Sequence, residues 1–221
     1  MIFKERDNRG MKKLAFVGAG SHADAIRPFI NSSKYELVGF FDDKQVNEHD
    51  GLPILGKTTD VIKSLENGNV DNLFITVGDN GKRAQWFNEI AKNYYDSLIN
   101  IIAPSATIID IESVQGRGIF IGAGAFVGRK VSIFDNTIIN THAVVEHHSI
   151  VEKHVNLTPN AVIAGFVHLK TGVYMGLSSS AIQLVTIPEW SIIGAGAVVI
   201  KNPESTGTYV GIPAKKLESN L

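Results

Sequence analysis

A six-residue hydrophobic period runs through the second half of the chain. From Ile121 to Val199, every sixth residue is apolar, and the residue four places after each of these is small or β-branched, from Ala125 to Ala197. With about half of all residues apolar, a run of this length would arise by chance about once in ten thousand sequences. The period is therefore a structural repeat.

This repeat predicts a stacked coil with three sides. Six residues suit a short strand and a tight corner, and three such units close a triangular coil of about eighteen residues. Successive coils would stack at about 4.8 Å, the spacing of hydrogen-bonded strands, with both columns pointing inward. Each buried Val, Leu or Ile contributes roughly 1.5–3 kcal/mol. We expect the coil over residues 101–221, with Gln115 interrupting the aliphatic column within the irregular stretch DIESVQGRG.

The first half of the chain has a different pattern. KKLAFVGAGSHADAIRPFI reads as an apolar strand, a glycine-rich turn and an amphipathic helix, and YELVGFFDD as a second strand ending in two aspartates. VDNLFITVGDNGKRAQWFNEIAKNY adds another strand, loop and helix. This order predicts an α/β domain with a Rossmann-like parallel sheet over residues 11–100, preceded by an extension over residues 1–10.

The loops of this domain are candidates for binding a nucleotide. Gly18 and Gly20 let the backbone approach a phosphate, and the amides that open a helix can receive an anion. Asp42 or Asp43 can accept hydrogen bonds from a ribose or a base. A tight strand-to-helix turn without any ligand is the alternative for the glycines.

Composition excludes several classes of partner and chemistry. Lysine plus arginine number 21 and aspartate plus glutamate 22, so no basic surface predicts binding to nucleic acid or to anionic membranes. The chain has no cysteine, which excludes disulfides and thiolate catalysis. The opening residues are charged, and no apolar stretch reaches membrane-spanning length, so we expect a cytoplasmic protein.

The segment VVEHHSIVEKHVNLTP concentrates three histidines. His147 and His148 follow the inward Val145, which places them at a corner of the coil with their side chains outward. One coil away from His147 lie Arg129 and Gly165, at the same edge. His142 and His154 fall at the two other corners, so one chain cannot bring the histidines onto one ion, and we expect no metal.

The stretches IGAGAFVGRKVS, IGAGAVVIKN and VGIPAK resemble the hexapeptide-repeat acyltransferases, whose tube is an all-β left-handed parallel β-helix. Together with the first half, the chain resembles the bacterial nucleotide-sugar N-acetyltransferases of bacillosamine, perosamine and sialic acid biosynthesis. These enzymes acetylate the 4-amino group of UDP-, dTDP- or GDP-linked 4-amino-4,6-dideoxy sugars. The resemblance implies acetyl-CoA as co-substrate, a role in polysaccharide biosynthesis, and a homotrimer with sites between subunits.

The resemblance also implies roles for particular residues. His147 matches the family's catalytic base, and Asn140 and His154 match two further family positions, with His154 able to reach a shared site only across a subunit boundary. The residues implied for the nucleotide sugar are Gly18, Gly20, Ser21, His22, Asp42, Asp43, Gly78, Asp79, Asn80 and His154. Those implied for acetyl-CoA, in a groove between adjacent tubes, are Gly165, Gly194, Ala195, Lys201 and Lys215.

Acetyl transfer to an amine needs few groups. Histidine, with an ordinary pKa near 6.5, can accept the proton that the amine loses, and such a base contributes about 10²–10⁴-fold. A backbone amide at Gly165 would donate to the carbonyl oxygen as its charge grows, which is worth about 10²–10³-fold. Direct transfer then depends mainly on placing the amine and the thioester together.

The chain departs from the family pattern at one position. The family has an aspartate or glutamate directly after the base, and here His148 stands there. Either Glu146 or Glu152 takes over the orienting role, or the base is weaker and the amine arrives already deprotonated. Outside N-acetylation we keep a sugar O-acetyltransferase of the sialic acid type, a trimeric zinc hydratase and a catalytically silent sugar-binding or ice-binding β-helix as alternatives.

Overall fold

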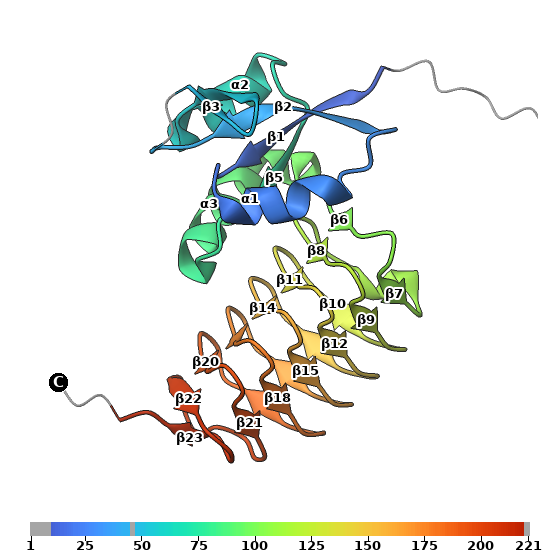
Figure 1. Ribbon diagram of the computed structural model, residues 1–221, viewed down its shortest axis with the longest axis vertical. Helices are drawn as coiled ribbons and strands as arrows, with labels where there is room; N and C mark the ends of the chain where they lie inside the picture. The colour runs from blue at the N-terminus through green and yellow to red at the C-terminus, as the bar shows by residue number, and fades with distance from the viewer. Residues whose placement is uncertain (1–9, 45–46, 219–221) are drawn as a thin grey trace, which may run out of the picture.

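The computed structural model describes residues 10–44 and 47–218. Figure 1 shows a rounded domain, coloured blue to green, seated on one end of a tube of short strands coloured green to red. The predicted extension over residues 1–10 lies, apart from Gly10, outside the described residues.

The N-terminal domain is built on a five-stranded sheet in the order β3-β4-β2-β1-β5. Its strands are β1 (Lys12–Val17), β2 (Tyr35–Phe41), β3 (Glu48–His49), β4 (Leu52–Gly56) and β5 (Asn72–Ile75). All pairs are parallel except β3 with β4. The predicted parallel α/β arrangement is therefore present.

Three α-helices cover this sheet: α1 (Ser21–Ile26), α2 (Val61–Glu66) and α3 (Asn80–Tyr94). Helix α1 is shorter than the amphipathic pattern suggests, because it passes into a 3₁₀ turn (Arg27–Phe29) that contains Pro28. Further 3₁₀ turns cover Thr58–Asp60, Tyr95–Ser97 and Ile111–Ser113. Each face of the sheet has its own apolar cluster.

One of these clusters joins the domain to the tube. Phe16, Phe40 and Phe74 form a row of ring contacts with centroids about 6 Å apart. Phe120 and Ile138 belong to the same buried cluster although they come from the tube, and they are 3% and 1% exposed. The tube and the domain therefore share a core at their junction.

The tube has three sheets, which we call its first, second and third faces and which are parallel throughout except for the last strand, β23. The first face has the order β23-β22-β20-β17-β14-β11-β8-β6, the second β21-β18-β15-β12-β9-β7 and the third β10-β13-β16-β19. Strands in neighbouring coils pair eighteen residues apart, as Ile138 with Asn156 shows. The strands are β6 (Ile101–Ile102), β7 (Thr107–Ile108), β8 (Phe120–Ile121), β9 (Phe126–Val127), β10 (Ser132–Ile133), β11 (Ile138–Ile139), β12 (Val144–Val145), β13 (Ile150–Val151), β14 (Asn156–Leu157), β15 (Val162–Ile163), β16 (His168–Leu169), β17 (Tyr174–Met175), β18 (Ser180–Ala181), β19 (Thr186–Ile187), β20 (Ile192–Ile193), β21 (Val198–Val199), β22 (Thr208–Val210) and β23 (Lys215–Lys216).

Both sequence columns point into the tube, as predicted. The aliphatic column from Ile121 to Val199 and the small column from Ala125 to Ala197 are between 0% and 3% exposed. Near Gln115 the repeat is irregular, and Val114 makes the bridge to Ile133 where the column would have placed Gln115. The predicted fold class, a Rossmann-like α/β domain followed by a left-handed parallel β-helix, is confirmed.

The corners of the tube use left-handed backbone. His142, His148 and His154, six residues apart, have φ angles of 54°, 59° and 64°. A left-handed conformation is uncommon outside glycine, and asparagine, aspartate and histidine adopt it more readily than most residues. The three histidines thus occupy equivalent backbone positions at three different corners.

The distal end of the tube has a different strand direction. Strand β22 continues the first face in parallel with β20, and β23 then runs antiparallel to β22, with Val210 opposite Lys215. The regular stack of parallel strands therefore stops at this hairpin (Figure 1).

Candidate active site

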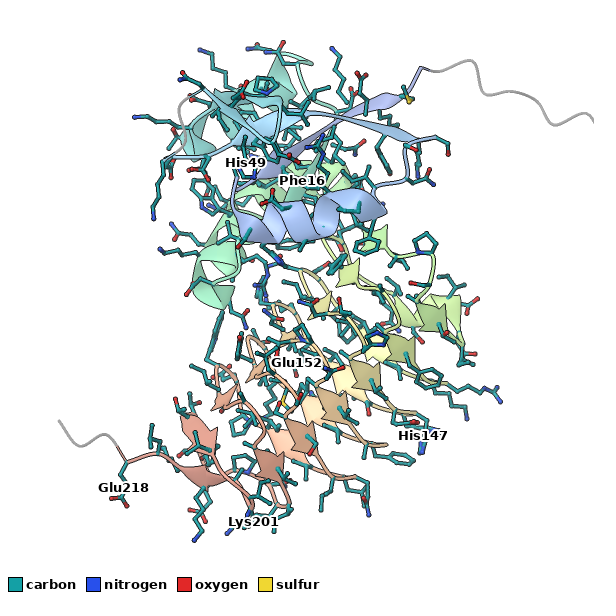
Figure 2. All side chains as sticks on the ribbon, in the orientation of Figure 1. Phe16, His49, His147, Glu152, Lys201 and Glu218 are labelled. Carbon is teal, nitrogen blue, oxygen red and sulfur yellow. The ribbon has the colours of Figure 1, made fainter. Side chains whose placement is uncertain are left out.

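His147 lies at the corner between the second and third faces, between β12 and β13. Its side chain is exposed and extends away from the tube (Figure 2). His148 N–H donates to the Arg129 carbonyl and Phe166 N–H donates to the His147 carbonyl, each at 3.0 Å. The predicted stacking of positions 129, 147 and 165 at one edge is therefore confirmed.

Gly165 leaves room for the imidazole of His147. A Cβ atom at Gly165 would lie 2.4 Å from Cε1 of the ring, so any side chain there would displace it. Among the described residues, the Gly165 N–H has no backbone hydrogen bond, because this corner position falls outside the ladder between coils. An unpaired donor and an imidazole thus meet at one edge, as acyl transfer requires.

His148 contacts the His147 ring directly. The two Nδ1 atoms are 3.1 Å apart, and the His148 ring stacks on Phe166 with a centroid distance of 4.5 Å. Burial against these neighbours, followed by the charges of Lys130, His147 and Arg129, lowers the pKa of His148. A neutral His148 can accept a hydrogen bond from the Nδ1–H of His147, which leaves Nε2 of His147 available as a base.

The two candidate carboxylates have other partners. Glu146 accepts from the His147 backbone N–H at 3.3 Å and not from its ring. Glu152 accepts from Thr171 Oγ1 at 2.7 Å and contacts His168 Nε2 at 2.7 Å. Burial alone would raise the pKa of Glu152, and the hydrogen bonds from Thr171 and His168 lower it. Within the described part of the chain, neither carboxylate makes a hydrogen bond to the His147 ring. His148 is therefore the side chain that contacts and orients this ring.

Asn140 lies at another corner, between the first and second faces. Its Oδ1 accepts from Thr141 N–H at 2.7 Å. Gly194 stands three coils further along the same corner, where its N–H donates to the Tyr209 carbonyl at 2.8 Å. Asn140 and Gly194 thus share a corner with each other, and one chain does not bring them to His147.

The two lysines implied for coenzyme binding come together at the distal end. Lys201 and Lys215 line one cavity of about 220 Å³, which Tyr209 and Glu204 also line. Figure 2 shows Lys201 at the end of the tube opposite the N-terminal domain. Ala195 is exposed on the corner nearby, and its N–H is absent from the backbone hydrogen bonds of the described residues.

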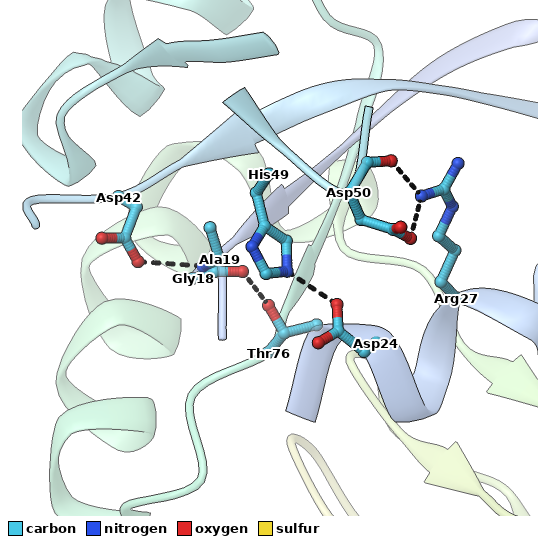
Figure 3. Close-up of polar contacts among 8 residues, drawn as sticks. All are labelled: Gly18, Ala19, Asp24, Arg27, Asp42, His49, Asp50 and Thr76. Atoms are coloured by element: carbon cyan, nitrogen blue, oxygen red, sulfur yellow. Dashed lines mark hydrogen bonds and ion pairs between the residues drawn. The ribbon is translucent and has the colours of Figure 1, made fainter. Parts of the chain in front are cut away.

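The glycine-rich turn of the N-terminal domain is held by neighbouring strands. Gly18 has a φ of 110°, and its carbonyl accepts from Thr76 Oγ1 at 2.6 Å. Asp42 accepts from the Ala19 N–H at 2.9 Å, so this carboxylate stabilises the turn (Figure 3). The Asp43 carboxylate instead accepts from Thr58 Oγ1 at 2.8 Å. Of the two aspartates, Asp42 is the one beside the turn.

Two side-chain contacts that the sequence did not reveal link α1 and the 3₁₀ turn after it to the β3–β4 hairpin. His49 Nε2 lies 2.6 Å from Asp24 Oδ1, and Arg27 pairs with Asp50 (Figure 3). Their partners are about 25 residues apart in sequence and follow no recognisable spacing. The hairpin is thereby held beside the helix that follows Gly20.

Ser21 and His22 open α1. Ser21 is exposed, whereas Nε2 of His22 is buried and has no hydrogen-bond partner among the described residues. Burial, with a smaller contribution from the charge of Arg83, lowers the pKa of His22 to about 4. His22 is therefore a neutral imidazole at physiological pH.

His154 does not lie in an open site, contrary to the expected contact with substrate. It is 2% exposed, its Nδ1 is 2.8 Å from Asn136 Nδ2, and Phe87 packs against its ring at 5.6 Å. Burial, with a smaller contribution from nearby cations, lowers its pKa to about 4. The helix α3 covers this corner, which the repeat pattern of the tube could not indicate. His154 is therefore part of the domain junction.

The loop at residues 78–80 contacts the tube. Asp79 caps α3 by accepting from Lys82 N–H at 2.8 Å, and Asn80 Nδ2 donates to the Gly172 carbonyl at 3.2 Å. Gly78, Asp79 and Asn80 line a cavity of about 320 Å³ together with Gly81, Gly172, Tyr174, Trp190 and Ile192. No pattern in the sequence indicates the aromatic side of this cavity, because Trp190 reads as a packing residue and not as a recognition residue.

Two classes of site have no support in the described residues. No group of three or more His, Asp or Glu side chains there is arranged to hold a metal ion. Among the same residues, no helix has the length and apolar character needed to cross a bilayer.

Comparison with known proteins places this geometry in context. Residues 13–90 match the PglD N-terminal domain family. The acetyltransferase domain of PglB from Neisseria gonorrhoeae is 28% identical, with a TM-score of 0.85 over 93% of this chain and 100% of that one. A mutant of perosamine N-acetyltransferase from Caulobacter crescentus, in complex with CoA and GDP-perosamine, is 27% identical, with a TM-score of 0.83 over 94% and 97%.

The resemblance to the nucleotide-sugar N-acetyltransferases is confirmed. The chain is an acyltransferase, as the repeat motifs predicted. WeeI from Acinetobacter baumannii, at 21% identity and a TM-score of 0.76 over 92% and 99%, supports the fold of this acyltransferase. The PglB domain has also been solved in complex with acetyl coenzyme A.

Proposed function

We propose that this chain transfers the acetyl group of acetyl-CoA to the amino group of a nucleotide-linked amino sugar, with His147 as general base. The observation that carries the proposal is the edge where the His147 ring lies against Gly165. The N–H of Gly165 makes no backbone hydrogen bond to a neighbouring coil among the described residues. The solved relatives bound to acetyl coenzyme A and to CoA with GDP-perosamine support the two substrate classes.

The proposed reaction is a direct transfer. The neutral amine attacks the thioester carbonyl, Nε2 of His147 takes the proton from the nitrogen, and the Gly165 N–H donates to the oxygen as it becomes negative. The tetrahedral intermediate then collapses, the C–S bond breaks, and the coenzyme leaves as a thiolate that takes up the proton held on His147, which restores the neutral base. His148 holds the His147 ring through the contact between their Nδ1 atoms.

We further propose that the active chain is a homotrimer. Asn140, Gly194 and Ala195 share one corner of the tube and His147 lies at another, so a complete site needs a second tube beside the first. Lys201 and Lys215 would then attract the phosphates of a coenzyme lying in the groove between two tubes. Exposed apolar side chains along the coils, such as Ile150 at 40% and Val162 at 38%, are consistent with a covered surface.

The nucleotide-linked sugar is proposed to bind to the N-terminal domain. Gly18, Gly20, Ser21 and His22 would lie near the diphosphate and the sugar, and Asp42 near the base. A neutral His22 suits hydrogen bonding to sugar hydroxyls. Gly78, Asp79 and Asn80 would form the second wall of the same site.

The direct test is an acetyl-transfer assay with purified protein, acetyl-CoA and a panel of UDP-, dTDP- and GDP-linked 4-amino-4,6-dideoxy sugars. We expect turnover with one of them, and we expect His147→Ala to lower kcat at least a hundredfold while acetyl-CoA still binds. His168→Ala, a histidine on the third face whose ring contacts Glu152, is the matched control and should stay within threefold. Near-normal turnover by His147→Ala would remove His147 from the mechanism.

O-acetylation of a sugar hydroxyl is the second candidate. A hydroxyl is a poorer nucleophile than an amine and depends more on a strongly oriented base. His147 is oriented by a second imidazole and by no carboxylate within the described residues, which favours the amine. Offering matched hydroxy sugars in the same assay separates the two reactions.

A further inference from the structure

We infer that Arg83 is a positioning residue that holds the loop at residues 77–80 in register with the tube and thereby sets the affinity for the nucleotide-linked substrate. The inference rests on the proposed function only for the identity of that substrate. It assigns a role to a side chain in the junction between the domain and the tube that none of the motifs singled out.

The first observation is the path of α3. Five residues, each one coil after the last, form the corner between the third and first faces, and all have left-handed backbone: Gly118, Asn136, His154, Gly172 and Trp190. Helix α3 has 15 residues, which spans about 22 Å, and four steps between coils span about 19 Å. The helix is therefore long enough to run along this corner.

Contacts from the first residue and from the middle of the helix support this path. Asn80, the first residue of α3, donates to the Gly172 carbonyl at 3.2 Å. Phe87, in the middle, packs against the His154 ring, and a Cβ at Gly118 would lie 3.2 Å from the Phe87 ring. The helix thus lies along the corner from Gly172 to Gly118, and Arg83 sits one turn after Asn80.

Arg83 joins the loop to the tube through backbone carbonyls. Its Nη2 donates to the His154 carbonyl at 3.1 Å and its Nε to the Asn136 carbonyl at 3.4 Å. Its Nη1 donates to the carbonyls of Val77 and Gly78, both at 3.4 Å. One planar guanidinium therefore contacts two successive coils on one side and the loop on the other.

This arginine is costly to bury. It is 1% exposed, and burial lowers its pKa to about 10, opposed by the charge of Asp79. None of its hydrogen bonds among the described residues goes to a carboxylate. A methionine of similar length would fill the same space without the cost of desolvating a charge. The fork of donors, which only arginine supplies, is the property that a hydrophobic residue would lose.

The position of the loop matters because of what it carries. Gly78, Asp79 and Asn80 line the cavity between the domain and the tube, and Arg83 reaches the carbonyl of the first of them. Its charge also acts on His22 in the other predicted binding loop. Loss of the fork would let the loop move relative to the tube without touching the His147 corner.

The test compares Arg83→Met and Arg83→Lys with Arg117→Met in the full chain. Arg117 pairs with Asp96 at 3.3 Å beyond the other end of α3, so it also joins the domain to the tube but lies away from the loop. We expect both Arg83 variants to raise KM for the nucleotide sugar at least tenfold, with kcat and KM for acetyl-CoA within threefold. Arg117→Met should leave all three constants within twofold.

Amide hydrogen exchange provides a readout that does not depend on turnover. The amides of residues 77–82 should exchange at least tenfold faster in the Arg83 variants than in the wild-type chain. Their exchange rates should be unchanged in Arg117→Met. Arg83→Lys keeps the charge but cannot hold four carbonyls, so a normal KM and normal loop exchange in this variant would overturn the inference. If Arg83→Met does not fold, Arg83→Lys decides alone.

The two proposals fail in different ways. If the wild-type chain acetylated none of the nucleotide-linked amines, the proposed function would fail, and the exchange data would still decide the role of Arg83. If Arg83→Lys lowered kcat, left the KM of both substrates unchanged and kept the exchange rates of the loop amides, the inference would fail and the proposed function would stand.

Discussion

The corner that carries His147 and His148 and the corner that carries His154 have the same backbone and opposite environments. His148 and His154 are six residues apart, with φ angles of 59° and 64°. The first corner is open to solvent, and the second is covered by α3, which leaves His154 2% exposed. The repeat sets the backbone position of each histidine. Whether another element covers the corner determines how exposed the imidazole is, and therefore whether it can exchange protons with a substrate.

Each corner also uses its histidine differently. At the open corner two imidazoles contact each other and Phe166, and the Nε2 atom of His147 remains available for a proton. At the covered corner the imidazole contacts Asn136, and Nε2 of His154 is buried without a partner among the described residues. The open corner is thus suited to proton transfer and the covered one to joining two domains.

Filling the space beside the open corner should have the largest effect. In Gly165→Ala the new Cβ would lie 2.4 Å from Cε1 of His147, so the ring has to leave its place. We expect kcat to fall by about thirtyfold or more, since misplacing a general base removes most of a 10²–10⁴-fold contribution. Gln183→Ala, one coil further along the same column, is the control and should retain activity.

Changing the partner of His147 should have an intermediate effect. In His148→Glu a carboxylate beside the ring favours the imidazolium and raises the pKa of His147, so the acid limb of the pH–kcat profile should move to higher pH by about one unit. His148→Gln carries no charge and should not raise the limb. A profile that is identical in all three proteins would contradict coupling between the two rings.

The covered corner should respond through stability and by the smallest amount. With a folded pKa of about 4 against an ordinary 6.5, His154 binds fewer protons in the folded state, so stability falls as pH drops from 6.5 towards 4. We expect a contribution of about 1–2 kcal/mol, or a Tm change of several degrees. His154→Gln should flatten the pH dependence of Tm, with His22 contributing the remainder, whereas His142→Gln should leave the slope unchanged.

The sequence predicted the tube better than the site. The six-residue period is a local rule repeated many times, so both inward columns, the corners and the edge shared by His147 and Gly165 follow from counting. The spacing of Asn80 and Arg83 does not indicate that they contact the tube, because their partners there lie more than fifty residues away in the sequence. Contacts between two folded units depend on how the units pack against each other, and this packing leaves no repeating pattern in the sequence.

The same reasoning explains the two residues whose environments differ from expectation. His154 fits its corner by counting, but α3 comes from a separate segment and covers it. Asp43 stands beside Asp42 at the end of a strand, and only the position of Thr58 shows that the Asp43 carboxylate has another hydrogen-bond partner. The replacement of the family's carboxylate by His148 was visible in the sequence, whereas its contact with His147 required the coordinates.

The hairpin at the distal end has a consequence beyond this one chain. A coil that stopped at β20 would present a row of unsatisfied amides and carbonyls, to which the first coil of another molecule could add and begin a fibre. The reversed β23, with the charged side chains of Lys215 and Lys216, interrupts that template on the first face, while the N-terminal domain covers the opposite end. The hairpin thus opposes end-to-end addition along this face and leaves the sides of the tube for assembly.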